Sequence, residues 1–361
     1  MSREIRVAIV GCGAIARHAH VPAWLNNREA AIVALCDPET AAADIIRDRH
    51  KLSCQTYRSL DDVLERERPD VVDICSPGYL HVEQAQRSLE AGSHVLVEKP
   101  PASTAAGAEH LARLAASKNL KLGAIFNYRY RDLIVQLKQL SVEGALGDLV
   151  KVYITHHGPL IFSEAPWLWN EKKSKYLVWE FGIHFLDILV HLLGPHERVL
   201  HVLPFEQPAV GHTTDLEVSI AFAGGAVGRL EITSDSLRHS THFTHIQAYG
   251  TGMDAFVRWF PPLLRTTAGQ LTPMKAIGDE LKAAWTIGQK LVSGTFLRER
   301  NISHYRTIDA YVDWLRGRGT YPVRFEDILP TIRLLEEIGR QVPSYVRDES
   351  AEAERPGAEA C

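Results

Sequence analysis

The sequence has few cysteines, no signal-peptide pattern and no long apolar run. Its five cysteines, at positions 12, 36, 54, 75 and 361, have no paired or C-x-x-C spacing, so we interpret them as reduced thiols that fill small apolar spaces. No apolar segment reaches the roughly 20 residues that cross a bilayer, which excludes a transmembrane protein. We therefore expect a cytoplasmic protein for which membrane contact is not a feature.

The sequence also lacks a block of charges of one sign. Its formal net charge is -4, and no basic run is long enough to contact a phosphate backbone, which argues against a nucleic-acid partner. Hydrophobic residues make up 45% of the chain and charged residues 23%, the composition of a soluble globular protein. With 361 residues, the chain is long enough for two domains and a substantial core.

An apolar strand, Val7 to Val10, runs directly into the stretch G-C-G-A-I-A at positions 11–16. In a dinucleotide-binding fingerprint the first glycine, here Gly11, allows a tight turn, and the second, Gly13, lets the backbone approach a pyrophosphate. The third small residue, Ala16, lets the following helix pack on the strand. Because a helix N-terminus offers unpaired N–H groups to an anion, this stretch predicts a phosphate-binding turn.

A carboxylate follows at the spacing of a dinucleotide-binding unit. A second apolar run, 31–36, ends in Asp37, where such units place the acid that binds the adenosine ribose. Asp37 would repel a 2′-phosphate, and Pro38 rather than an arginine comes next, so we predict NAD in preference to NADP. The alternative is that Asp37 only begins a turn with Pro38.

Strands and helices alternate through the first third of the chain, which predicts a doubly wound parallel sheet of the α/β class. Ligands of such sheets lie at the carboxyl ends of the strands, and polar residues gather after three strands, at 76–81, 98–101 and 127–129. The expected strands are 7–10, 31–36, 71–76, 94–97 and 122–126, and the expected helices are 39–52, 59–68, 81–90 and 104–118.

From about residue 150 the segments become short and often alternate in polarity. Gly224-Gly225 and Gly250-Thr251-Gly252 stand where hairpin turns are needed, so we predict a C-terminal α+β domain with a mainly antiparallel open sheet. Helices are expected at 179–193, 302–316 and 325–341, the last two returning to the first domain. The predicted division is 1–127 for the cofactor domain, 128–345 for the substrate and oligomerisation domain, and 346–361 for a disordered acidic tail.

Residues 261–300 fit neither pattern and contain a predicted amphipathic helix near 274–291. We interpret this helix as a surface element or an oligomer contact. A docking surface for an amphiphilic substrate or a membrane is the alternative.

With these strand ends located, the sequence resembles the glucose-fructose oxidoreductase, inositol dehydrogenase and rhizopine-catabolism (Gfo/Idh/MocA) family. The resemblance covers nearly the whole chain outside 261–300 and the tail. Its motifs are G-C-G-A-I-A with H-V-P-A at 20–23, Ser-Pro at 76–77 with His81, E-K-P at 98–100, and G-I-H-F-L-D at 182–187.

The resemblance implies NAD(P)-dependent oxidation or reduction of a sugar, cyclitol or polyol by a homo-oligomer, a dimer or a tetramer. It implies that Lys99 lies beside the nicotinamide, that His184 is the acid/base, and that Glu180 orients His184. The expected cofactor-binding residues are Gly11, Gly13, Ala14, Ile15, Asp37, Ser76, Pro77, His81, Glu98 and Lys99. The candidate substrate residues are Tyr128, Arg129, Trp169, Tyr176 and Asp187.

The residues support these roles independently. On a helix, Glu180 and His184 share a face, and a carboxylate beside an imidazole holds its tautomer and raises its basicity. Lys99, desolvated at a strand end near a cationic nicotinamide, is expected to have a lowered pKa. It would then exchange protons or donate a hydrogen bond to a developing alkoxide.

Several alternatives stay open at this point. One alternative is that His184 is a core histidine whose ring is fully hydrogen-bonded. Another is a metal site on a single helix, because the spacing suits Glu180, His184, Asp187 and His191. We predict no metal, since hydride transfer to NAD needs none. Asp187 and His191 can also form a structural pair. Tyr128 and Arg129 are either substrate contacts or solvated strand-end residues.

The sequence departs from the family pattern at three places, so the substrate of another family member does not carry over to this chain. The residues before the predicted catalytic helix read Ser174-Lys175-Tyr176 where many members have three glycines. The acid four positions before the histidine is Glu180 rather than aspartate, and Gly78 replaces a common asparagine.

We predict an NAD-dependent oxidoreductase that transfers a hydride between nicotinamide and a secondary alcohol or ketone of a sugar, nucleotide sugar or cyclitol. A hydrolase or lyase that oxidises a sugar only transiently would use the same residues. A cofactor-binding regulator without chemistry is the third hypothesis, against which the presence of both Lys99 and His184 argues.

Overall fold

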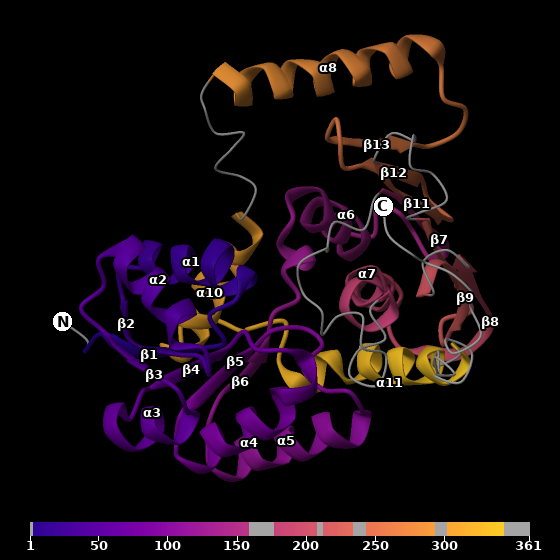
Figure 1. The fold of residues 1–361 in the computed structure, drawn as a ribbon. Helices are drawn as coiled ribbons and strands as arrows, with labels where there is room; N and C mark the ends of the chain where they lie inside the picture. Colours follow the sequence, from indigo (N-terminus) through magenta and orange to yellow (C-terminus); the bar gives the residue numbers. More distant parts are fainter. Residues whose placement is uncertain (1–2, 159–176, 208–211, 234–242, 293–301, 343–361) are drawn as a thin grey trace, which may run out of the picture.

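The computed structural model describes residues 3–158, 177–207, 212–233, 243–292 and 302–342 (Figure 1). They form a six-stranded parallel sheet and a seven-stranded mixed sheet, with helices packed against both. The predicted α/β first domain and mainly antiparallel second sheet are confirmed. None of the helices in these residues combines the length and apolar character needed to cross a bilayer.

The first sheet has the strand order β3-β2-β1-β4-β5-β6, and every neighbouring pair is parallel. All four residues of β4 and the last three of β5 are buried, as expected of strands covered by helices on both faces. The strands are β1 (Ile5–Val10), β2 (Ala30–Cys36), β3 (Gln55–Tyr57), β4 (Val71–Ile74), β5 (His94–Val97) and β6 (Leu122–Ala124).

Helices cover both faces of this sheet. In Figure 1, α1 and α10 lie on one side of the strands and α4 and α5 on the other. The helices of this half are α1 (Val21–Asn26), α2 (Thr40–His50), α3 (Leu60–Glu67), α4 (His81–Glu90) and α5 (Ala105–Ser117), and the C-terminal α10 (Ile302–Leu315) and α11 (Phe325–Gln341) follow much later in the chain.

The second sheet has the order β13-β12-β11-β7-β10-β9-β8. One central pair, β7 with β10, is parallel, and the other pairs are antiparallel. The strands are β7 (Leu149–His157), β8 (His196–Gln207), β9 (His212–Phe222), β10 (Val227–Thr233), β11 (Phe243–Gly250), β12 (Asp254–Arg258) and β13 (Leu263–Thr267), and the helices beside them are α6 (Asp132–Val142), α7 (Ile183–Leu193) and α8 (Pro273–Val292).

Helix α7 is apolar on nearly every side and lies between the second sheet, α6 and α11 (Figure 1). The predicted helix 179–193 is present, but its first part, Leu177–Gly182, is a π-helical turn and only Ile183–Leu193 is α-helical. The helix after the glycine turn likewise passes through a π-helical turn, Ala16–His20, before α1. The sequence expectations omitted β3, β13 and α6.

The C-terminal helices return to the first domain, as predicted. Tyr311 on α10 donates its hydroxyl to the carbonyl of Val95 at 2.9 Å, and Tyr321 donates to the carbonyl of Ala124 at 2.7 Å. The Ala124 N–H in turn donates to the carbonyl of Val323 at 3.0 Å. The segment before α11 therefore covers the outer edge of β6.

Gly123 on β6 generates a stability prediction, because a Cβ built there lies 2.7 Å from a ring carbon of Tyr321 and 3.0 Å from one of Tyr311. Gly123→Ala should lower the free energy of unfolding by about 1–3 kcal/mol, since overpacking displaces both rings. Urea unfolding measures this. Gly224→Ala is the matched control, because a Cβ at Gly224 meets nothing within 4 Å. Equal unfolding midpoints for the two variants would contradict this packing account.

Candidate active site

The glycine turn at the end of β1 is built on close backbone contact. Gly11 has φ +89°, and a Cβ there would lie 2.5 Å from the backbone N of Ser76. A Cβ at Gly13 would meet nothing within 4 Å, and Gly13, Ala14 and Ile15 are exposed. Ala16 is fully buried, as the fingerprint predicts for its third small residue. The turn thus leaves an open cradle beside a helix start, which fits a bound pyrophosphate.

Asp37 at the end of β2 faces this turn. Its Oδ2 accepts the Cys12 N–H at 2.8 Å, and its Oδ1 accepts the Glu39 N–H at 2.9 Å. Asp37 therefore also begins a turn, as the alternative interpretation had it. Each carboxylate oxygen can accept a further hydrogen bond, so the residue still fits a ribose with two hydroxyl donors.

The residues that follow β4 form hydrogen bonds with one another and with the loop after β5. The Ser76 hydroxyl donates to Gln84 Oε1 at 2.6 Å, and both ring nitrogens of His81 lie 2.8 Å from carbonyl oxygens, those of Ser76 and Pro100. His81 is buried, and burial lowers the pKa of its ring. His81 therefore links the loop after β4 to the loop after β5. Pro77 lies between these loops and is partly buried.

Lys99 and Glu180, which are far apart in the sequence, meet at the end of β5. The Lys99 Nζ donates to the main-chain oxygen of Glu180 at 2.9 Å and lies 3.2 Å from its Oε2. Burial lowers the pKa of Lys99, but the carboxylates of Glu180 and Glu98 raise it more, so the net shift is upward. The expectation of a lowered Lys99 pKa is wrong, because two carboxylates surround the ammonium group.

His184 lies in the first turn of α7, stacked on Tyr128 with ring centroids 4.1 Å apart. Burial and the nearby Lys99 charge lower its pKa well below the usual value. Its Nδ1 is buried without a hydrogen-bond partner among the described residues. The predicted pairing with Glu180 is not present, because the π-helical turn has i to i+5 spacing and Glu180 is engaged by Lys99.

Two side chains that the sequence interpretation missed complete the wall around Tyr128. The Trp259 ring meets Tyr128 edge-on, with centroids 5.0 Å apart, and the Arg131 guanidinium lies 4.3 Å from the Tyr128 centroid and 4.1 Å from that of Trp259. Arg131 follows Arg129 in the same polar strand-end stretch, which was an available signal. Trp259 comes from the second sheet, and no spacing in the sequence indicates it.

Arg129 and Asp187 form a buried ion pair and are not placed to bind substrate. The guanidinium donates to both carboxylate oxygens, at 2.7 and 2.6 Å, and the side chains are 6% and 1% exposed. Thr331 donates to the same carboxylate at 2.9 Å. The substrate prediction for this pair is therefore corrected to a structural role, and Asp187 does not pair with His191. Trp169, Tyr176 and the 174–176 stretch lie outside the described residues.

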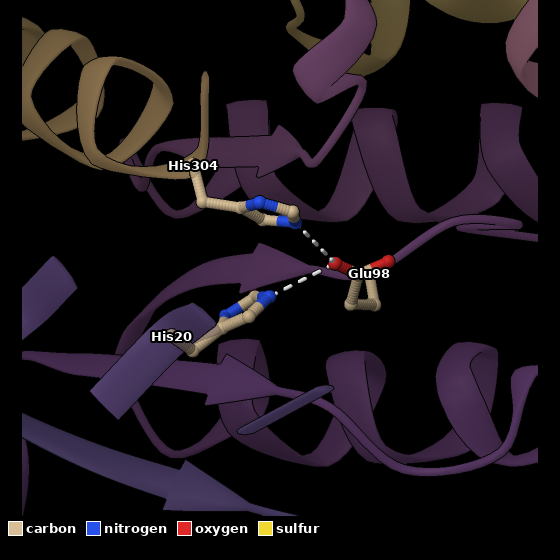
Figure 2. A group of neighbouring side chains, drawn as sticks. All are labelled: His20, Glu98 and His304. Carbon is tan, nitrogen blue, oxygen red and sulfur yellow. Dashed lines mark hydrogen bonds and ion pairs between the residues drawn. The ribbon is translucent and has the colours of Figure 1, made fainter. Parts of the chain in front are cut away.

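Beside Lys99, three side chains from distant segments converge: His20, Glu98 and His304 (Figure 2). The His20 Nε2 lies 2.9 Å from Glu98 Oε1, the His304 Nε2 lies 3.8 Å from the same oxygen, and the His20 Nδ1 lies 2.8 Å from Asp73 Oδ2. Glu98 Oε2 also accepts the Lys99 N–H at 3.0 Å. Glu98 is thus buried and positions the main chain of Lys99.

The buried charges of this cluster shift the pKa values of its members. Burial lowers the pKa of His20, but Asp73 raises it well above its usual value, so the ring carries a proton between two carboxylates. Burial raises the pKa of Glu98, but His20 lowers it to about 2. The ligand-type atoms lie within 4.8 Å of one another, and both His20 nitrogens are engaged by carboxylate oxygens, so these side chains form a hydrogen-bonded charge network. Of the residues in the single-helix metal alternative, Glu180 is paired with Lys99 and Asp187 with Arg129.

Comparison with known proteins agrees with this geometry. The model described as the oxidoreductase family with an NAD-binding Rossmann fold matches residues 5–126, and the Gfo/Idh/MocA C-terminal domain matches residues 134–253. Together they cover more than half of the chain. The chain belongs to the Gfo/Idh/MocA family, and its first domain is an NAD-binding Rossmann domain.

Several curated proteins that the chain resembles are sugar dehydrogenases. D-glucoside 3-dehydrogenase from Escherichia coli is 30% identical over 198 residues, 54% of this chain and 55% of the relative. Levoglucosan dehydrogenase from Pseudarthrobacter phenanthrenivorans is 29% identical over 249 residues, 61% and 62% of the two chains. The chain thus matches roughly half to two thirds of the length of these curated relatives.

Solved structures share the fold across nearly the whole chain. The WlbA dehydrogenase from Bordetella pertussis, crystallised with NADH and UDP-GlcNAcA, has a TM-score of 0.77 at 20% identity and covers 94% of this chain and 95% of its own. At this identity the similarity establishes the fold and no more.

The buried pair of Arg129 and Asp187 can be tested by changing its charge alone. Asp187→Asn leaves the guanidinium without a counter-charge, so the free energy of unfolding in urea should fall by about 3–5 kcal/mol. The double variant Arg129→Met, Asp187→Leu removes both charges and should recover much of the loss. An Asp187→Asn variant with wild-type stability would show that the pair does not stabilise the fold.

Proposed function

We propose that this protein is an NAD-dependent dehydrogenase that interconverts a secondary alcohol and a ketone on a sugar, nucleotide sugar or cyclitol. One observation carries the proposal: a buried ammonium group from the first domain and an imidazole from the second converge beside Tyr128. His184 stacks on the Tyr128 ring, and the Lys99 ammonium group is near enough for its charge to lower the pKa of His184.

The cradle fits NAD. Gly13 offers open space next to the helix start, and Asp37 has acceptor capacity for ribose hydroxyls. When bound, NAD⁺ accepts a hydride from the carbinol carbon of the substrate.

The protein's own groups handle the proton and the charge. The lowered pKa keeps His184 neutral near pH 7, so its ring can accept the hydroxyl proton of the substrate. Nδ1 is buried, which assigns this role to Nε2. The raised pKa keeps Lys99 charged, so its Nζ stabilises the developing alkoxide as a donor rather than as a base. Glu180 holds that ammonium group in place, and Glu98 accepts the Lys99 main-chain N–H.

The walls of the site favour a sugar ring. The His184 ring and the Arg131 guanidinium cover Tyr128, and Trp259 meets it edge-on, so Arg131 places several N–H donors beside His184, where they suit the hydroxyls of a sugar. The sugar dehydrogenases among the relatives support this substrate class. A panel of sugars and nucleotide sugars assayed for NADH formation tests it. A substrate that is cleaved without net NADH formation would instead establish the transient-oxidation hydrolase or lyase.

The role of Lys99 is tested by Lys99→Met, which removes the ammonium group and keeps most of the side-chain volume. Turnover should fall by about 10²- to 10³-fold, since a donor to the developing alkoxide is lost, while NAD binding measured by fluorescence titration is retained. Lys118→Met, at an exposed position, is the control and should leave turnover unchanged. Full activity of Lys99→Met would reject the assignment.

The pH dependence distinguishes donor from base. With a Lys99 pKa raised above 10.5 and a His184 pKa lowered below 6.5, kcat/KM for alcohol oxidation should stay level between these values. Glu180→Gln removes a carboxylate that raises the Lys99 pKa, so the loss of activity at high pH should begin at lower pH. Glu143→Gln, an exposed charge change, should not move the profile. A basic limb that stays in place in Glu180→Gln would contradict the donor role of Lys99.

A further inference from the structure

Helix α8 lies at the outer edge of the molecule, apart from the bulk of both sheets (Figure 1). It follows β13, the edge strand of the second sheet, and packs against that strand. A helix of 20 residues is about 30 Å long, so α8 presents a long side to solvent.

The charged side of α8 faces the protein. Arg258 on β12 donates to both carboxylate oxygens of Glu280, at 3.1 and 2.6 Å, and Arg265 on β13 donates to Asp279 at 2.8 Å. Ala283, one turn further on, is 4% exposed. These ion pairs fix the rotation of the helix about its own axis.

The apolar side of α8 therefore faces outward, the reverse of an ordinary surface helix. Five large apolar side chains on this side are each more than half exposed: Met274 77%, Ile277 55%, Leu281 65%, Trp285 69% and Val292 92%. They form one stripe of several hundred Å², and an exposed apolar patch of that size marks an interaction surface.

We propose that this stripe packs against α8 of a second copy of the chain, in an antiparallel helix pair about a twofold axis. Met274 and Leu281 are seven residues apart, and Gly278, Trp285 and Val292 repeat at the same interval, which is the spacing of helix-to-helix packing. A twofold axis near Leu281 brings Trp285 onto the second copy's Gly278. A Cβ at Gly278 meets nothing within 4 Å, so the surface there is open to the incoming ring.

Charge and area favour a second copy over a lipid surface. Helices that lie on membranes are rich in Lys and Arg on their polar face, whereas α8 carries three lysines, Lys275, Lys282 and Lys290, against Asp279 and Glu280, a net charge of only +1. In a standard protein interface each partner buries about 800 Å². Five large side chains that are each more than half exposed offer an area of the same order, which favours a helix pair.

Sedimentation velocity of the full chain tests the proposal independently of catalysis. Leu281→Glu, in the middle of the stripe, should halve the sedimenting mass relative to the wild type, because two charges would be buried at the axis. Lys282→Glu is the control: it introduces the same residue one position away, at an exposed site outside the stripe, and should leave the mass unchanged.

Three results would overturn the proposal. They are a monomeric wild-type chain, a Leu281→Glu variant with the wild-type mass, and equal dissociation of the two variants. Co-sedimentation of the wild type with phosphatidylserine vesicles, lost in Leu281→Glu without a change of mass, would assign the stripe to lipid instead. Circular dichroism and the unfolding midpoint of Leu281→Glu, both expected to match those of Lys282→Glu, exclude misfolding as the cause.

Discussion

The contact between Lys99 and Glu180 holds the site together. The ammonium group bonds to both the main-chain and the carboxylate oxygen of Glu180, and both side chains are largely removed from water. A buried charge without its partner is costly, so each residue fixes the other. This contact secures the π-helical turn against the end of β5, and His184 follows from that turn into α7. The relative placement of the glycine turn and His184 depends on this pair.

Much of the first domain was predictable because its signals are local. Apolar runs marked the buried strands, and Gly11 marked a turn whose positive φ and crowded surroundings require glycine. The approach of Lys99 to the second domain followed from its place at a strand end. These features depend on neighbours in the sequence, and a periodicity or a spacing is enough to locate them.

The rest of the site depends on contacts that no spacing encodes. In an ideal α-helix Glu180 would lie beside His184. The segment before His184 is instead a π-helical turn, and Glu180 contacts Lys99. Asp187, one of the predicted substrate residues, accepts hydrogen bonds from Arg129 and Thr331, which are distant from it in the sequence. Trp259 reached the site from the second sheet. The same limit applied to the network of His20, Asp73 and Glu98, whose members are separated by whole strands and helices.

The return of the C-terminal segment to β6 affects how the protein is made. A ribosome releases β1 to β6 early, but the outer edge of that sheet receives Val323 only after almost all of the second domain has been synthesised. Until then β6 is a bare edge strand that presents unpaired backbone groups, the kind of surface that recruits strands from other chains. The cofactor domain, first in translation, is thus among the last parts of the nascent polypeptide to close.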